Sequence, residues 1–238
     1  MSRFSEFSVR WSVPLALLLA VAPLPAEIPA WLKLVAAQPP GTYDSDVPAV
    51  TLLDEVEVAV KENGSETITH RCAVRILNRT GREQALAMVS YVEPDSRIVG
   101  ATAWLVRAGK EIRPADKRPW VDMSTTGGGQ VASDVRRRGI SYHDLALDGD
   151  VFGYETVVTA PLLFAQENMM WGGEFPTAVS RFTIQLPSGW TLRSVLDGPL
   201  AGKVKTSTAP GQWTWEVDDL PYRPDEPLMD GASRTAAR

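Results

Sequence analysis

The sequence is poor in the side chains on which catalysis and metal binding most often depend. Its 238 residues include one cysteine and two histidines. A single cysteine excludes an intramolecular disulfide and a cysteine-rich zinc site. The two histidines lack the HExxH spacing of a zinc site, and the glycine-rich stretches lack the GxxxxGK[ST] framework that holds phosphate. The sequence therefore predicts no cofactor and no metal.

An excess of positive charge is also missing. The chain has 24 Lys and Arg against 29 Asp and Glu, so its formal net charge is −5. A protein that neutralises nucleic-acid phosphates needs a basic surface. We therefore expect no nucleic-acid partner.

The apolar run near the N-terminus is too short to span a membrane as a helix. Residues 11–21 (WSVPLALLLAV) are 11 in number, whereas a spanning helix needs about 20. Arg3 and Arg10 precede this run, and small residues follow it, an order typical of a secretory signal peptide. We predict a signal peptide over residues 1–26 and export to the periplasm or the extracellular space, with the cleavage site left open. Membrane contact is then expected only through an uncleaved signal segment. The alternative interpretation of residues 1–26 is a buried N-terminal helix instead of a signal peptide.

Three further parts follow this segment. Residues 27–46 are predicted to hold a short helix, with Pro29 as its first residue and Ala37 at its end, and a linker rich in proline and polar residues. Residues 47–227 form the body of the protein, and residues 228–238 are predicted to be an unstructured tail.

The body alternates apolar and polar residues with the period of half-buried strands. Leu52, Val56, Val58 and Val60 are predicted to share one face of the first strand. Asn63-Gly64, a strong hairpin signal, leads into a return strand in which Ile68, His70, Cys72, Val74 and Ile76 share one face. Further strands are predicted at residues 85–92, 98–107, 110–113, 131–142, 150–159, 180–186, 191–196 and 212–217. Many short strands without a helical period predict an all-β, antiparallel sandwich.

Neither Cys72 nor the histidines occupy a position that favours catalysis. Cys72 lies in mid-strand on the apolar face, and His70 is two residues away, about 7 Å along the strand. A buried structural cysteine is therefore the favoured interpretation over a nucleophile. His143 and Asp144 are adjacent, and adjacent side chains of a strand point in opposite directions. We interpret them as loop residues.

Two groups of residues are candidates for contact with a partner. Arg136, Arg137 and Arg138 form a basic triplet that suits an acidic partner, or else a solvated strand edge that discourages pairing. Trp171 and Trp190 lie near turns, whereas Trp104 is predicted in the core and Trp213 and Trp215 on one face of the last strand. Exposed tryptophans would indicate contact with sugar or a partner, and buried ones would indicate packing.

The order of short motifs along residues 47–227 resembles the domain-of-unknown-function family 3857. This family is the β-sandwich module found N-terminal to transglutaminase-like domains in exported bacterial proteins. The motifs are VTLLDEVEVAV at 50–60, RILN at 75–78, WLV at 104–106, GDV at 149–151, YE at 154–155, RFTI at 181–184, LPSGW at 186–190, WTWE at 213–216, LP at 220–221 and PDEP at 224–227.

The resemblance implies an immunoglobulin-like sandwich without catalytic residues of its own. In the family, the transglutaminase-like domain follows the Pro-x-Glu-Pro motif, but here only residues 228–238 follow it. The catalytic cysteine, histidine and aspartate of that domain have no matching positions in this chain. The expectation is a truncated product, a fragment, or one half of a split protein.

The sequence thus supports three functional hypotheses. The favoured one is a non-catalytic, exported module that packs against a transglutaminase-like peptidase or transferase partner, or presents substrate to it. The second is a stand-alone sandwich that binds carbohydrate or peptide. The third is a weak enzyme that uses Cys72 or His143. The oligomeric state is left open.

Overall fold

The computed structural model describes residues 27–112, 118–124, 134–162 and 166–222. These residues form one short α-helix, two 3-10 turns and two β-sheets, so the predicted all-β, sandwich-like class is confirmed. The predicted signal peptide at 1–26, the tail at 228–238 and the start of the predicted strand at 131–142 lie outside the described residues. No helix among the described residues is long and apolar enough to cross a membrane. The elements are α1 (Ala30–Ala36), β1 (Ala49–Val60), β2 (Ser65–Ile76), η1 (Thr80–Gln84), β3 (Leu86–Val92), β4 (Arg97–Arg107), β5 (Lys110–Ile112), β6 (Val121–Ser124), β7 (Val135–Ser141), β8 (Val151–Pro161), β9 (Thr177–Gln185), η2 (Ala201–Lys203), β10 (Lys205–Ala209) and β11 (Gln212–Leu220).

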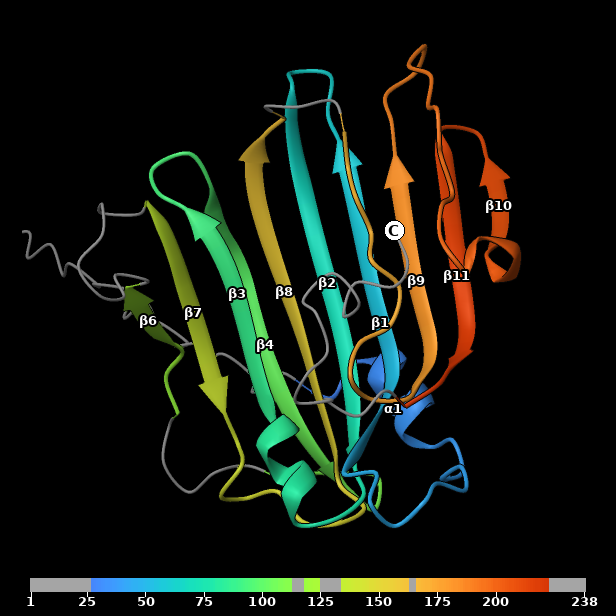
Figure 1. Ribbon diagram of the computed structural model, residues 1–238. Helices are drawn as coiled ribbons and strands as arrows, with labels where there is room; N and C mark the ends of the chain where they lie inside the picture. The colour runs from blue at the N-terminus through green and yellow to red at the C-terminus, as the bar shows by residue number, and fades with distance from the viewer. Residues whose placement is uncertain (1–26, 113–117, 125–133, 163–165, 223–238) are drawn as a thin grey trace, which may run out of the picture.

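The strands form a large and a small sheet (Figure 1). The large sheet has eight strands in the order β10-β11-β9-β1-β2-β8-β4-β5, and the small sheet has the order β3-β7-β6. The predicted hairpin joins β1 and β2 as antiparallel neighbours, with Gly64 at a positive φ of 74° in its turn. Among the described pairings, β1 with β9 alone is parallel. This pair departs from the expectation of a wholly antiparallel sandwich, and it joins segments more than 100 residues apart.

Helix α1 covers one face of the large sheet, which we call the outer face. Leu32 is fully buried on this face, directly over Gly153 of β8. A Cβ atom at position 153 would lie 2.5 Å from Leu32 Cδ1, so glycine is what lets the helix approach the strand. Trp31 meets Trp104 edge to face, with 6.3 Å between ring centroids. The helix begins one residue later than predicted, because Pro29 takes the N-cap position with an extended backbone.

Arginine side chains complete the outer face. Arg75 is buried, and its Nη2 donates to the carbonyl oxygens of Ala36 (2.9 Å) and Gln38 (2.8 Å), which holds the end of α1 on the sheet. A cation at this end of a helix also complements the helix dipole.

Beyond the helix, alternating charges cross the same face from strand to strand. Arg71 lies between Glu155 (2.7 Å) and Glu55 (3.0 Å), and Arg181 lies between Glu55 (2.7 Å) and Glu216 (2.7 Å). This ladder spans β8, β2, β1, β9 and β11. The part of the outer face that α1 does not cover therefore carries paired polar side chains.

The opposite, inner face is covered by two separate structures. The small sheet packs over β2, β4 and β8, where Phe152 and Leu105 are fully buried in contact with side chains such as Ile140. The strap, which we define as residues 166–171, lies with residues 192–200 over β1, β9 and β11. Figure 1 shows the small sheet and α1 on opposite sides of the large sheet.

Three details of the predicted strands are wrong. Leu52 does not share a face with Val56, Val58 and Val60, because a bulge between Thr51 and Leu53 turns it to the outer face against α1. Residues 191–196 form no strand, since β11 already occupies the edge of β9, and they run across the inner face instead. The short strands β6 and β10 were not predicted.

The contact of Leu32 with Gly153 predicts a large effect of one helix substitution. Leu32→Ala removes a fully buried side chain and leaves a cavity under α1, so the free energy of unfolding should fall by about 2–5 kcal/mol. Leu34→Ala on the same helix, where the side chain is 71% exposed, is the matched control and should change stability by less than about 0.5 kcal/mol. Urea unfolding of the two variants measures both values. Equal stability of the two variants would contradict this packing.

Candidate functional site

The only cysteine of the chain has the surroundings of an inert thiol. Cys72 lies in the middle of β2 on the inner face, with Asp54 of β1 and Tyr154 of β8 opposite it on the neighbouring strands. Burial, together with the charge of Asp54, raises the pKa of the Cys72 thiol, which lowers the thiolate fraction that nucleophilic attack requires. His70 Nε2 lies 2.8 Å from Asp54 Oδ1, and the His70 ring meets the Tyr154 ring edge to face at 5.2 Å. The interpretation of Cys72 as structural agrees with this geometry.

A serine next to this group does not complete a catalytic triad. Ser180 of β9 is fully buried opposite Asp54, and its hydroxyl has no hydrogen-bond partner among the described residues. A Ser-His-Asp triad needs the histidine between the serine and the carboxylate. Here β1, with Asp54, lies between Ser180 on β9 and His70 on β2. The order of the strands therefore places the carboxylate where a base would have to be.

His143 and Asp144 have different partners in the structure and are not paired with each other as a base with its carboxylate. His143 Nδ1 lies 2.9 Å from the Ser141 hydroxyl, while Asp144 forms a bidentate ion pair with Arg118. Hydrogen bonds from Arg118 lower the pKa of Asp144 to about 2. Among the described residues, no three of His, Cys, Asp or Glu are grouped so that they could hold a metal ion.

The basic triplet lies on β7, the central strand of the small sheet. Arg136 donates from Nε to Glu93 (2.8 Å), and Arg138 donates to both carboxylate oxygens of Asp122 (2.6 and 2.7 Å). Alternation along the strand places Arg137 on the other face, and it has no ion-pair partner among the described residues. Contact of the triplet with a partner stays a prediction, with Arg137 as the member best placed for it.

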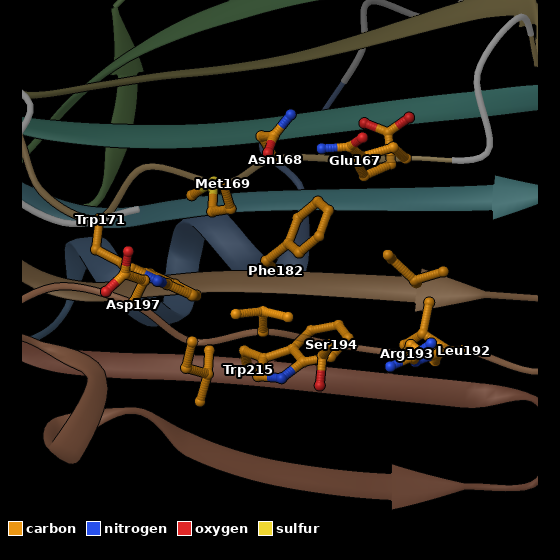
Figure 2. Close-up of a pocket in the computed structure, with 14 residues that line it drawn as sticks. Glu167, Asn168, Met169, Trp171, Phe182, Leu192, Arg193, Ser194, Asp197 and Trp215 are labelled. Carbon is orange, nitrogen blue, oxygen red and sulfur yellow. The ribbon is translucent and has the colours of Figure 1, made fainter.

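A cavity of about 310 Å³ opens between the strap and the inner face of β9 and β11 (Figure 2). Phe182 and Trp215 form its floor, stacked at 5.9 Å with 29° between their planes. Trp171 of the strap also lines it and is 6% exposed. Trp190 is 43% exposed in the turn region after β9 and does not line the cavity. The structure therefore does not bring together Trp171, Trp190 and the arginine triplet, whose roles in partner contact stay predictions.

A second cavity, of about 250 Å³, adjoins the first because Gln166 and Glu167 line both. It lies where the strap meets the β3–β4 turn of the other cover, above the start of β2 and the end of β8. Glu66 of β2 lines this cavity, is 8% exposed, and its Oε2 has no hydrogen-bond partner among the described residues. Figure 2 shows Glu167 and Trp171 at opposite ends of the larger cavity.

The two glutamates differ in exposure, because Glu66 is buried in the sheet and Glu167 belongs to the exposed part of the strap. Burial raises the pKa of Glu66. Partial burial of its carboxyl group and the nearby charge of Glu66 raise the pKa of Glu167, although the residue as a whole is exposed. Sequence analysis missed both residues, although Glu66 gave a signal: it shares the face of β2 on which Ile68, Cys72 and Val74 alternate as inward residues. A charged residue at such a position is expected to have a partner or a function.

The fold and these cavities define an all-β module with an aromatic cavity and an adjoining acidic one. A family model, DUF3857 (a domain of unknown function with a solved structure), matches residues 62–224. The chain belongs to the DUF3857 family, which confirms the resemblance found in the sequence. No curated protein matches the chain.

The fold also occurs in solved structures. The crystal structure of a "putative protease" from Parabacteroides distasonis aligns with a TM-score of 0.63 at 11% identity, over 80% of this chain and 39% of that one. The M1 zinc metallopeptidase from Deinococcus radiodurans aligns with a TM-score of only 0.31 at 10% identity, over 74% of this chain and 39% of that one. A likeness as low as the second does not establish a common fold. The chain spans about two fifths of the length of each of these proteins.

The buried carboxylate of Glu66 predicts that a neutral replacement stabilises the fold at neutral pH. Folding raises the pKa of this carboxyl group above its ordinary value of 4.5. The folded protein therefore loses stability as the pH rises from 4.5 through the raised value. Glu66→Gln should therefore raise the melting temperature at pH 8. In a domain of this size, each 1 kcal/mol of stabilisation corresponds to a rise of roughly 2–4 °C. The gain should disappear near pH 4.

Glu62→Gln is the control for this measurement. Glu62 is exposed in the turn before β2, so its replacement removes the same charge without changing a buried group. Differential scanning calorimetry of the three proteins at pH 4 and pH 8 gives the comparison. An equal gain from Glu62→Gln would show that net charge, and not burial, is responsible.

Proposed function

We propose that this protein is a non-catalytic accessory module that is exported and acts beside a transglutaminase-like domain, in the same or a separate polypeptide. Its part is to bind a segment of the substrate polypeptide in the cavity of Figure 2 and present it to that domain. The observation that carries the proposal is the position of Cys72: the one thiol of the chain is held in mid-strand, with a raised pKa and without an available base.

Two other findings support this function. The chain belongs to the DUF3857 family, and the sequence resemblance implies that modules of this family precede transglutaminase-like domains. The Parabacteroides distasonis protein, described as a "putative protease", contains the same fold over 39% of its length, so the fold occurs there as one part of a larger protein.

A stand-alone binding role is the second candidate, and the aromatic floor of the larger cavity favours peptide over carbohydrate as its ligand. Sugars stack on the open faces of exposed aromatic rings, whereas Trp215 and Phe182 are only 5% and 7% exposed. Aromatic rings with so little exposed surface are better suited to contact with an apolar side chain than to stacking with a sugar ring.

The accessory role predicts that the chain alone has no acyl-transfer or peptidase activity that depends on Cys72. Wild type and Cys72→Ser should give equal background values in amine incorporation into casein and in casein hydrolysis. Both proteins should bind a separately purified transglutaminase-like domain from the same cell with equal affinity in calorimetry. An activity of the wild type that Cys72→Ser abolishes would overturn the proposal, as would the absence of binding to such a domain.

Export is tested separately. Residues 1–26 fused to a reporter enzyme that is active only outside the cytoplasm should give activity, because their charged start and short apolar run direct secretion. Replacement of two leucines of the apolar run by arginine should abolish it. Equal reporter activity with and without these replacements would contradict the signal peptide.

A further inference from the structure

We propose that the cavity lined by Glu66 and Glu167 is a binding site for an alkylammonium group, the chemistry shared by a lysine side chain and a small aliphatic amine. This site goes beyond the proposed function, because its ligand chemistry follows from the cavity alone and requires no partner domain.

The unpartnered carboxylate oxygen of Glu66 indicates that the missing partner is a cation. Glu66 is 8% exposed and leaves Oε2 without a hydrogen bond among the described residues. Glu167, an exposed residue, lies close enough for the two charges to interact. Asp95, an exposed residue, adds a third carboxylate to the wall. No lysine or arginine among the described residues lines this cavity. A buried carboxylate without a counter-charge is costly, and a ligand cation would remove that cost.

The remaining wall selects the kind of cation. Val92, Ala160 and Pro161 are apolar and lie beside the carboxylates. Such a wall suits the methylene stem of an alkylammonium group, whose three N–H donors can reach two carboxylates at once. A calcium ion needs six to eight oxygen ligands, which these side chains do not supply as a group.

The position of the site relative to the larger cavity suits an extended ligand. Gln166 and Glu167 line both cavities, so the cavity above Phe182 and Trp215 and the cavity of the carboxylates lie next to each other along the strap. A peptide with an apolar side chain followed by lysine could place one in each cavity. Recognition would then combine apolar burial with a charge-assisted hydrogen bond.

The test uses the full chain, with n-butylamine and N-acetyl-lysine-amide as probes, titrated by NMR chemical shift at pH 7 and low salt. Saturable shifts of the resonances of Glu66, Ala160 and Glu167 are expected for both probes. Glu66→Gln and Glu167→Gln should each weaken binding by about tenfold to a hundredfold, the effect of losing one hydrogen bond to a charged group. Glu62→Gln, which removes an exposed charge in the same hairpin, should bind as the wild type does.

Comparison of the two probes identifies the source of the ligand, and three results would contradict the proposed site. Tighter binding of N-acetyl-lysine-amide than of n-butylamine supports a polypeptide ligand, and equal binding supports a free amine. The proposal is overturned if neither probe gives a saturable shift, if the glutamine variants bind as the wild type does, or if calcium binds in place of the amines. Thermal melting confirms that each variant is folded, and Glu167→Gln tests the site even if Glu66→Gln does not fold.

Discussion

The large sheet of this protein has apolar side chains on both faces, and the rest of the structure follows from the need to cover them. Helix α1 covers the outer face where Leu32 fits over Gly153. Where the helix ends, the ladder that runs through Arg71, Glu55 and Arg181 replaces apolar residues with paired charges. These ion pairs are half-buried and share carboxylates, so they hold five strands in register where an isolated surface pair would contribute little. On the outer face, paired charges thus take over from apolar packing where the helix ends.

The inner face is covered in two parts that come from different regions of the chain. The small sheet covers β4 and β8, and the strap with its neighbouring loop covers β9 and β11. Polar side chains of the inner face are found between these two covers, including Asp54 and His70, whose side chains are each 31% exposed. The cavity with Glu66 lies in the same zone, at the contact between the β3–β4 turn and the strap. The candidate site is therefore a consequence of how two covers meet on one sheet.

Most of the fold but little of the site could be predicted from the sequence, for a physical reason. Period-two alternation and the Asn63-Gly64 turn act locally, so they located the β1–β2 hairpin and most other strands. The bulge that turns Leu52 outward and the parallel pairing of β1 with β9 depend on segments distant in the chain. Residues 191–196 alternate as a strand would, yet no sheet edge is open to them beside β9. Glu66 was recognisable only as a charge at an inward position, and its neighbour Glu167 comes from a segment without any pattern.

Glu66 also explains why this part of the fold is not optimised for stability. A glutamine or an apolar residue at position 66 would destabilise the folded protein less than the charged carboxylate does, because burial disfavours the charged form and raises the pKa of this group. Structural glutamates elsewhere in the protein are paired: Glu55 contacts two arginines, and Glu216 contacts Arg181. Paired and unpaired glutamates thus occur in the same sheet, so the general acidity of the chain does not explain why Glu66 lacks a partner. Unpaired buried charge beside an aromatic cavity is a pattern typical of binding sites, where the ligand supplies the missing partner.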